Sequence, residues 1–347
     1  MKKTTLVLLA TALMTACIDD HTPDDSTPAD YGGRALVLCE GAWGNNDASL
    51  TMVSTQSGDA DNQWFEEGNG RGLGDVAQDM LLYGTKAYVT VTFSNSLEAI
   101  DTATGQSIRH DMGNMHPRSI AVHDGRLFIS CYGGHTVVVC DTTDLDHHVA
   151  TLQLGDYQPE GLAVADGRLF VASSWIQRAN QAFDYDSSLY VFDLSTLTLD
   201  TIITVGLNPQ TVVTLDDNHV AVNHNGDYGS IPSGCAIVNT TTLTVSQIER
   251  STTGITATDG TLYAFYRQGY GSSMTTSYWC YNAGTFTQLP IDADHPYSIS
   301  VDTVGNIYIT TDGNYVASGD VLCYTPDGAL LWRTEAGILP KKVIVLR

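Results

Sequence analysis

The sequence contains few of the residue combinations with which enzymes make or break bonds. None of its ten histidines lies in an H-E-x-x-H zinc motif, and no serine lies in a G-x-S-x-G nucleophile motif. It contains no glycine-rich phosphate loop and no D-x-D-x-D-G calcium loop. His116 and His295 precede prolines in matching repeats; such a pair could hold a metal, but repetition alone explains it almost as well. We therefore expect no catalytic set, no metal site and no cofactor.

Aromatic and polar residues between the expected strands are better candidates for ligand binding. Long segments such as EGAWGNNDA and SSWIQRANQAFDYDS place rigid rings among Gly, Ser and Asn. This composition is typical of recognition surfaces, although any single ring could instead pack inside the fold. The predicted ligand-binding residues are Trp43, Asn45, Asn46, His116, Arg118, Trp175, Tyr185, His224, Tyr228, Arg267, Tyr270, His295, Tyr297, Asn314 and Tyr315.

A repeated strand pattern predicts how these segments are positioned. Units made of a turn, an alternating strand, a loop and a second strand begin at Gly84, Asp124, Asp166 and Asp259. A proline between two larger residues precedes most units, with a period of roughly 45 residues, the spacing of β-propeller blades. Alternating strands of this kind bury one face. The repeat therefore favours a β-propeller over a β-helix or a helical solenoid.

The two ends of the chain predict how the ring closes. Seven innermost strands are expected, and the last of them, in 341–347, has no partners after it. The N-terminal segments RALVLCE, SLTMVST and DNQWFEE can supply its three missing partners and remove the exposed sheet edges. We predict that 34–347 is one all-β domain, a seven-bladed β-propeller with four antiparallel strands per blade. The C-terminal strand would close it by pairing with the N-terminal blade.

Loop lengths distinguish the two faces of this ring. Connections between the second and third strands of a blade share one face with the connections that lead to the next blade. These are the long aromatic segments, and we call this side the long-loop face. The opposite turns, such as HDGR and ADGR, are short and carry the Asp and Gly of ordinary turns. We therefore interpret Asp101, Asp141 and Asp193 as turn residues.

Net charge restricts the partners. The chain has 39 Asp and Glu against 16 Lys and Arg, a formal charge of -23. A protein that binds nucleic acid needs a basic surface, so we expect no nucleic-acid partner. Six cysteines in the propeller lie in or beside strands, and Cys131 and Cys140 flank one hairpin. An exported chain permits disulfides, and buried free thiols are equally compatible with the sequence.

The N-terminus has the features of an exported lipoprotein. Two lysines precede an apolar run over residues 6–13, a secretory signal too short to span a membrane as a stable helix. The Ala16–Cys17 pair resembles a bacterial lipobox, which implies a signal peptide over 1–16 and lipidation of Cys17. An ordinary signal peptide with an incidental cysteine is the alternative. Residues 17–33 are rich in Asp and Pro and are expected to form an acidic tether.

The acidic pair Asp19–Asp20 after the cysteine resembles the export signal of Bacteroidetes lipoproteins. This resemblance implies attachment to the outer membrane at the cell surface. A solvated spacer is the alternative interpretation of the same residues.

Over nearly the whole mature chain, the sequence resembles YncE-like seven-bladed propellers of Bacteroidetes surface lipoproteins. The segments LCEGAWGNNDASLTMVST, GRGLGDVAQDMLLYGTKAYVTV and GNIYITTDGNYVASGD carry the resemblance. It is greatest to the BtuG proteins, which capture cobalamin above a TonB-dependent transporter. The resemblance implies a surface lipoprotein that captures cobalamin or a related corrinoid and passes it to a TonB-dependent outer-membrane transporter. It assigns no individual ligand contacts.

Two other classes of function remain open. Propellers also host lyases and hydrolases, so an enzyme acting on a surface polysaccharide is one alternative. A purely structural or adhesive surface protein is the other. An enzyme would need a tuned acid, base or nucleophile, which the sequence does not display.

Overall fold

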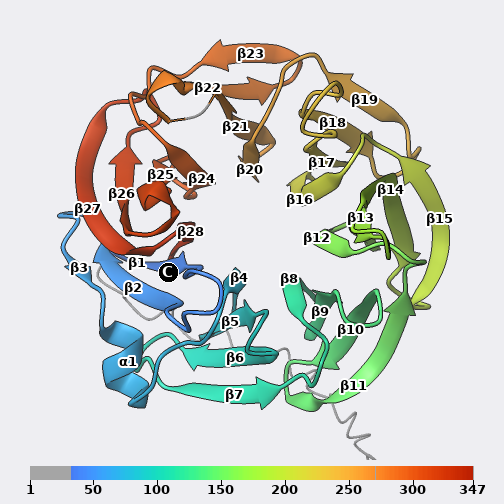
Figure 1. The fold of residues 1–347 in the computed structure, drawn as a ribbon, viewed down its shortest axis with the longest axis horizontal. Coiled ribbons are helices and arrows are strands. Elements are labelled where there is room, and N and C mark those ends of the chain that lie inside the picture. The colour runs from blue at the N-terminus through green and yellow to red at the C-terminus, as the bar shows by residue number, and fades with distance from the viewer. Residues whose placement is uncertain (1–32, 270, 347) are drawn as a thin grey trace, which may run out of the picture.

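The protein is a closed ring of seven antiparallel sheets, each with four strands (Figure 1). The computed structural model describes residues 33–269 and 271–346. The ring confirms the predicted seven-bladed β-propeller. Cys17, the signal peptide and all of the predicted tether except Gly33 lie outside the described residues. Within the described chain, no helix is both long enough and apolar enough to cross a membrane.

The first four blades each consist of four consecutive strands, given from the axis outward. Blade 1 contains β4 (Ala77–Tyr83), β5 (Lys86–Val91), β6 (Ser96–Asp101) and β7 (Ser107–Asp111). Blade 2 contains β8 (Pro117–His123), β9 (Arg126–Cys131), β10 (Thr136–Asp141) and β11 (Asp144–Gln153). Blade 3 contains β12 (Pro159–Ala165), β13 (Arg168–Gln177), β14 (Phe183–Asp193) and β15 (Thr198–Thr204). Blade 4 contains β16 (Pro209–Asp216), β17 (His219–His224), β18 (Gly234–Asn239) and β19 (Val245–Ile248).

The last three blades include the closure and the two short 3₁₀ helices. Blade 5 contains β20 (Gly254–Thr258), β21 (Thr261–Gln268), η1 (Gly271–Ser273), β22 (Thr275–Asn282) and β23 (Thr285–Gln288). Blade 6 contains β24 (Pro296–Val301), β25 (Ile307–Thr311), η2 (Gly313–Tyr315), β26 (Ser318–Tyr324) and β27 (Leu330–Ile338). Blade 7 contains β28 (Pro340–Val345), β1 (Arg34–Cys39), β2 (Ser49–Ser54) and β3 (Ala60–Asp61).

Blade 7 joins both ends of the chain, as predicted. The innermost strand β28 pairs antiparallel with β1, and Val343 lies opposite Val37. The C-terminus therefore lies beside β1 at the inner side of the ring (Figure 1). A ring closed in this way leaves no sheet edge between its first and last blades.

The predicted third partner strand, DNQWFEE, is wrong. Strand β3 has two residues, and the segment continues as the short helix α1 (Trp64–Asn69). Consecutive aromatic residues explain the difference, because a strand would direct Trp64 and Phe65 to opposite faces. On the helix, both rings pack against the core between blades 7 and 1. Gly70, in the left-handed conformation with φ 62°, ends the helix.

The core consists of apolar layers between neighbouring blades. In β10, Val137 and Val139 pack toward blade 3, whereas Val138 and Cys140 pack toward blade 1. This alternation is the two-residue period of a strand with both faces covered.

The cysteines of the propeller are free thiols. Five are buried, and Cys280 is partly exposed. Cys131 lies opposite Thr136 and Cys140 lies opposite Leu127, so the two hairpin cysteines are not direct cross-strand partners. Burial raises the pKa of Cys140 to about 11 and that of Cys235 to about 12. These thiols therefore act as small apolar core residues.

A buried carboxylate holds the outer part of blade 1 to the preceding loop. Glu98 is fully buried and lies 2.7 Å from the Arg71 guanidinium and 2.6 Å from that of Arg109. Ser107 donates a further hydrogen bond to it. Burial opposes ionisation of Glu98, but Arg71, Ser107 and Arg109 together hold its pKa below the usual value. The native state thus favours the ionised carboxylate.

We expect Glu98→Gln to lower the free energy of unfolding at pH 7 by about 1–3 kcal/mol, because both guanidiniums lose their carboxylate partner. Glu98 has a lower pKa in the folded state than in the unfolded state. Its contribution is therefore complete above the unfolded pKa of about 4.3 and disappears as the pH falls through the folded pKa. Urea denaturation of both proteins at pH 7 and pH 3.5 measures the difference, which should shrink at the lower pH. The exposed control Glu249→Gln should show little change at either pH. A Glu98→Gln effect that is the same at both pH values would contradict the stabilising role of the ionised Glu98 carboxylate.

Candidate functional site

Aromatic rings form a continuous arc on the long-loop face across blades 2, 3 and 4. Tyr132 contacts Trp175 at 5.8 Å between ring centroids, and Trp175 contacts Phe183 at 5.3 Å. Phe183 stacks on Tyr185 at 6.5 Å, and Tyr185 contacts Tyr228 at 6.2 Å. The exposed fraction reaches 54% for Phe183 and 71% for Tyr228. We call these five residues the aromatic arc.

The middle of the aromatic arc lies on an extended hairpin. The sequence predicted a long loop here, but β13 and β14 continue past the body of blade 3. Trp175 pairs with Tyr185, and Gln177 pairs with Phe183, after a bulge that follows Ser173. The hairpin therefore holds its rings on backbone hydrogen bonds, which is a more rigid support than a loop provides.

Both ends of the aromatic arc reach residues near the axis of the ring. The Tyr132 hydroxyl donates a hydrogen bond to Glu160 at the start of β12. At the other end, the Asn225 side-chain amide donates to the Tyr228 hydroxyl at 2.9 Å. Glu160 and Asn225 both line the axial cavity described below. The arc and the cavity thus form adjoining parts of one surface.

A second aromatic group lies over blades 7, 1 and 2. Trp43 contacts Phe93 at 6.1 Å, and Phe93 contacts the His116 ring at 5.9 Å. Trp43 is 76% exposed, and its loop neighbours Asn45 and Asn46 are exposed as well. An indole ring and two side-chain amides of this group are therefore accessible to a ligand.

A third group, over blades 5 and 6, is largely engaged in contacts within the protein. Arg267 lies 3.1 Å from the buried Asp312 carboxylate and donates to the Tyr315 hydroxyl at 2.8 Å. Tyr297 and Tyr315 meet edge to face at 6.3 Å. The backbone N–H of Asn314 donates to Asp312 at 3.0 Å, and His295 lies 4.0 Å from the same carboxylate. Tyr315, which is 49% exposed, is the most accessible ring of this group.

His224 lies beneath the face rather than on it. Its ring packs between Gly206 and Gly234, where a Cβ atom would come within 2.3 and 2.8 Å of ring carbons. Burial lowers its pKa, which keeps the imidazole neutral at physiological pH. His224 is therefore a packing residue, and the two glycines make room for it.

Tyr270, another predicted residue, lies outside the described residues. Among the described residues, no group of three or more His, Cys, Asp or Glu is arranged to hold a metal ion. Sequence reasoning missed Phe93, Tyr132 and Phe183, which connect the predicted rings to one another. Each of the three lies at or just beyond the end of a strand, beside a long-loop-face connection. Their aromatic type at this position is the signal that could have identified them.

A repeated bulge places polar side chains at the axis of the ring. Six of the seven inner strands show a register shift within their first residues. A bulge of this kind leaves one residue unpaired and redirects its side chain. The exception is β20, where Gly254 pairs regularly with Phe265. The side chains at the shifted positions, which we call the axial tier, are Gln78, Arg118, Glu160, Gln210, Tyr297 and Lys341.

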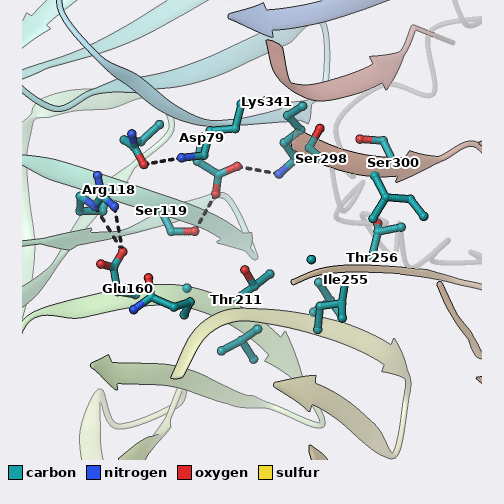
Figure 2. Close-up of a pocket in the computed structure, with 18 of the residues that line it drawn as sticks. Asp79, Arg118, Ser119, Glu160, Thr211, Ile255, Thr256, Ser298, Ser300 and Lys341 are labelled. Atoms are coloured by element: carbon teal, nitrogen blue, oxygen red, sulfur yellow. Dashed lines mark hydrogen bonds and ion pairs between the residues drawn. The ribbon is translucent and has the colours of Figure 1, made fainter. Parts of the chain in front are cut away.

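The axial tier and the residues after it line a cavity of about 490 Å³. Figure 2 shows Asp79, Arg118, Ser119 and Glu160 on one side of it, away from Ile255 and Thr256. Blades 4 and 5 contribute uncharged residues, whereas blades 7, 1, 2 and 3 contribute every charged residue of the lining. The cavity wall is therefore charged on one side and uncharged on the other.

Blades 2 and 3 meet at the axis through a buried ion pair. The Arg118 Nε and Nη2 atoms both lie 3.2 Å from Oε2 of Glu160. The Arg118 guanidinium also lies 4.6 Å from the centre of the Tyr132 ring, a cation–π distance. Burial disfavours the charge on Arg118, but Glu160, Tyr132 and Glu40 together more than offset it and raise the pKa of the guanidinium. Burial and Glu160 likewise raise the pKa of Tyr132, which keeps that hydroxyl protonated.

Two lysines of β28 connect blade 7 to blade 1. Lys341 lies 3.2 Å from Glu40 and donates to the side-chain amide oxygen Oε1 of Gln78 at 2.6 Å. Lys342 lies 2.6 Å from Asp79. Burial alone would raise the pKa of Glu40 and of Asp79, but the adjacent lysines and hydrogen-bond donors hold both below the usual values.

The axial charges were another omission of the sequence reasoning. Among the axial tier, only Arg118 and Tyr297 were predicted as ligand residues, and both are held by protein partners. The signal was present, because most axial-tier residues directly follow the recurring proline that marks each blade.

These features define a seven-bladed β-propeller whose aromatic face adjoins a charged axial cavity. No protein-family model matches the chain, and no curated protein matches its sequence. Solved structures do match its fold. The hydrazine synthase of Kuenenia stuttgartiensis is 16% identical, covers 78% of this chain and 95% of its own, and has a TM-score of 0.62.

A quinonprotein alcohol dehydrogenase-like protein from Bacteroides thetaiotaomicron is 14% identical, covers 91% of this chain and 79% of its own, and has a TM-score of 0.67. The WD40 repeats of RRP9 are 9% identical, with 76% and 81% covered and a TM-score of 0.56. Identities this low establish the propeller fold and leave the function to be argued from the site.

Proposed function

We propose that this propeller is a binding protein rather than an enzyme, and that it captures a large amphipathic nutrient on the long-loop face. Cobalamin or another corrinoid is the proposed ligand. The aromatic arc carries the proposal, because five rings in mutual contact on one face form an apolar surface that ends beside polar groups. Exposed aromatic clusters on otherwise soluble surfaces mark binding sites.

The chemistry of a corrinoid suits this surface. A corrinoid combines a flat macrocycle and a nucleotide base with peripheral amide arms. Rings of the aromatic arc can cover the flat groups, while the Asn45, Asn46 and Asn225 amides can pair with the arms. The ligand has little net charge, so the formal charge of -23 on the chain does not oppose its approach.

We further propose that the protein is a surface lipoprotein of the outer membrane. Lipid on Cys17 would hold it there, and a TonB-dependent transporter would receive the captured ligand. The sequence resemblance to BtuG-type propellers and the lipobox-like Ala16–Cys17 pair support this part of the proposal.

Cys17→Ser is expected to abolish metabolic labelling with palmitate and to shift the protein out of the membrane fraction. The reason is that the substitution removes the thiol that would carry the diacylglycerol. Cys280→Ser, at a partly exposed thiol of the propeller, is the matched control and should keep both label and membrane association. Palmitate label that persists in Cys17→Ser would disprove the anchor.

Calorimetry with cyanocobalamin tests the ligand. We expect saturable heat with one site per chain and a shift of the visible spectrum of the corrinoid. Arg126→Ala, on the opposite face, should bind as the original protein does. Absence of both heat and spectral shift at micromolar protein would reject the corrinoid.

A further inference from the structure

The axial cavity contains hydrogen-bond donors that the protein itself does not use. We propose that it binds a small organic carboxylate, whose carboxylate group would lie among Arg118, Lys341 and Lys342 and whose apolar body would lie deeper along the axis. This site adjoins the aromatic arc at Tyr132, but the proposal does not depend on the identity of the ligand captured on the arc.

The acidic residues that line the cavity, Asp79 and Glu160, and Glu40, which contacts lining residues, have their acceptors occupied. Both Glu40 oxygens accept, one from Gln78 and the other from Tyr297 and Lys341. Each Asp79 oxygen accepts two hydrogen bonds, from Met80 and Lys342 on one side and from Ser119 and Ile120 on the other.

Glu160 is occupied in the same way. One of its oxygens accepts from the Tyr132 hydroxyl, and the other accepts twice from Arg118. The three carboxylates therefore already accept hydrogen bonds from the protein. They have little remaining capacity to accept hydrogen bonds from a ligand.

The cationic side chains of the wall, in contrast, have N–H donors without a partner among the described residues. Among the described residues, Nη1 of Arg118 has no hydrogen-bond partner, because the two bonds to Glu160 come from Nε and Nη2. Lys342 uses one of its three N–H groups, on Asp79, and Lys341 uses two, on Glu40 and Gln78. Two of the three described lysines of a strongly acidic chain thus lie on this wall with free donor capacity. Free donors on cations are the groups that bind an oxyanion.

The rest of the wall favours an organic anion with a single charge. Beyond the charged residues, the lining combines hydroxyl-bearing residues such as Thr211, Thr256 and Ser298 with the aliphatic residues Ile120, Leu162, Val212, Ile255 and Ile299. An apolar body placed there is removed from water. The three cations already face Glu40, Asp79 and Glu160, so the site can compensate one added negative charge more readily than the two of phosphate. A volume of about 490 Å³ is within the range of small-molecule sites.

Titration with butyrate, followed by ligand-observed NMR and calorimetry, tests this site. We expect saturable butyrate binding, and at least tenfold weaker binding of butyramide, which has the same shape without the charge. Inorganic phosphate should also bind at least tenfold more weakly than butyrate. Equal affinities for butyrate and butyramide, or no saturable butyrate binding by the intact protein, would overturn the proposal.

Two kinds of variant locate the site. Lys342→Met should weaken butyrate binding at least tenfold, and it leaves Asp79 with its other three donors. Arg118→Met combined with Glu160→Gln removes the guanidinium without leaving a buried carboxylate unpaired, and should have the same effect. Arg126→Gln, a cation outside the cavity, is the control, and melting curves establish that each variant is folded. Undiminished butyrate binding by either folded variant contradicts the proposal.

Discussion

Deleting residues 341–347 should lower the melting temperature of the propeller more than any single substitution considered above. Strand β28 is the innermost strand of blade 7, and it pairs with β1 from Lys342 opposite Leu38 to Val345 opposite Ala35. Its loss exposes the inner edge of β1. It also uncovers apolar side chains in the cores between blades, among them Val37 and the core residues against which Ile344 packs. We expect a loss of about 5 kcal/mol or more, against a total stability of about 5–15 kcal/mol. Thermal and urea denaturation measure it.

The double variant Lys341→Met with Lys342→Met separates the two contributions of β28. It keeps the strand and its backbone hydrogen bonds, but removes the ion pairs with Glu40 and Asp79. We expect a smaller loss than in the deletion, because the ladder and its apolar packing remain. A truncated chain that melts like the intact protein would show that β28 does not close the ring.

The repeats made the fold predictable from the sequence. Each blade repeats one strand pattern, and the unpartnered last strand requires N-terminal partners. The failure at Trp64 and Phe65 has a physical reason, because a helical turn lets both rings pack against the same core between blades 7 and 1, whereas a strand would direct them to opposite faces. That choice depends on the core between blades 7 and 1, which a local pattern does not contain.

The axial cavity was harder to predict, because its contacts join distant residues. Arg118 and Glu160 are 42 residues apart, and Tyr297 and Glu40 are 257 apart. The Arg118–Glu160 pair could be predicted from the repeat length and the ring together, because residues one repeat apart occupy equivalent positions of adjacent blades and meet at the axis. The second also requires the closure of the ring, which brings the N-terminal blade beside blade 6.

The extended hairpin of blade 3 shows a limit of a different kind. Ser, Asn and charged residues around Trp175 and Tyr185 indicated a loop, yet the strands continue and pair these two residues. Cross-strand aromatic packing outweighs the weak strand propensity of the residues between them. The aromatic side chains were thus identified correctly as a group, while the backbone that positions them was not.

Trp175→Ala and Tyr228→Ala are each expected to weaken cyanocobalamin binding by about 1–4 kcal/mol, as is usual for aromatic anchors at the centre of an interface. Trp175 contacts rings on both sides, Tyr132 and Phe183, so its loss also removes support from the rest of the aromatic arc. Tyr228 ends the arc, is 71% exposed and is held through its hydroxyl by Asn225. Isothermal titration calorimetry of folded variants measures both losses.

Leu330→Ala is the matched control for these two substitutions. Leu330 is an apolar residue of the outer strand β27 and is 53% exposed, so its truncation removes exposed apolar surface far from the arc. Corrinoid affinity should not change in this variant. Because Trp175 and Tyr228 are joined through Phe183 and Tyr185, their double variant should lose less than the sum of the single losses. Additive losses would mean that the rings act as separate contacts, and unchanged affinity in both single variants would move the binding site away from the aromatic arc.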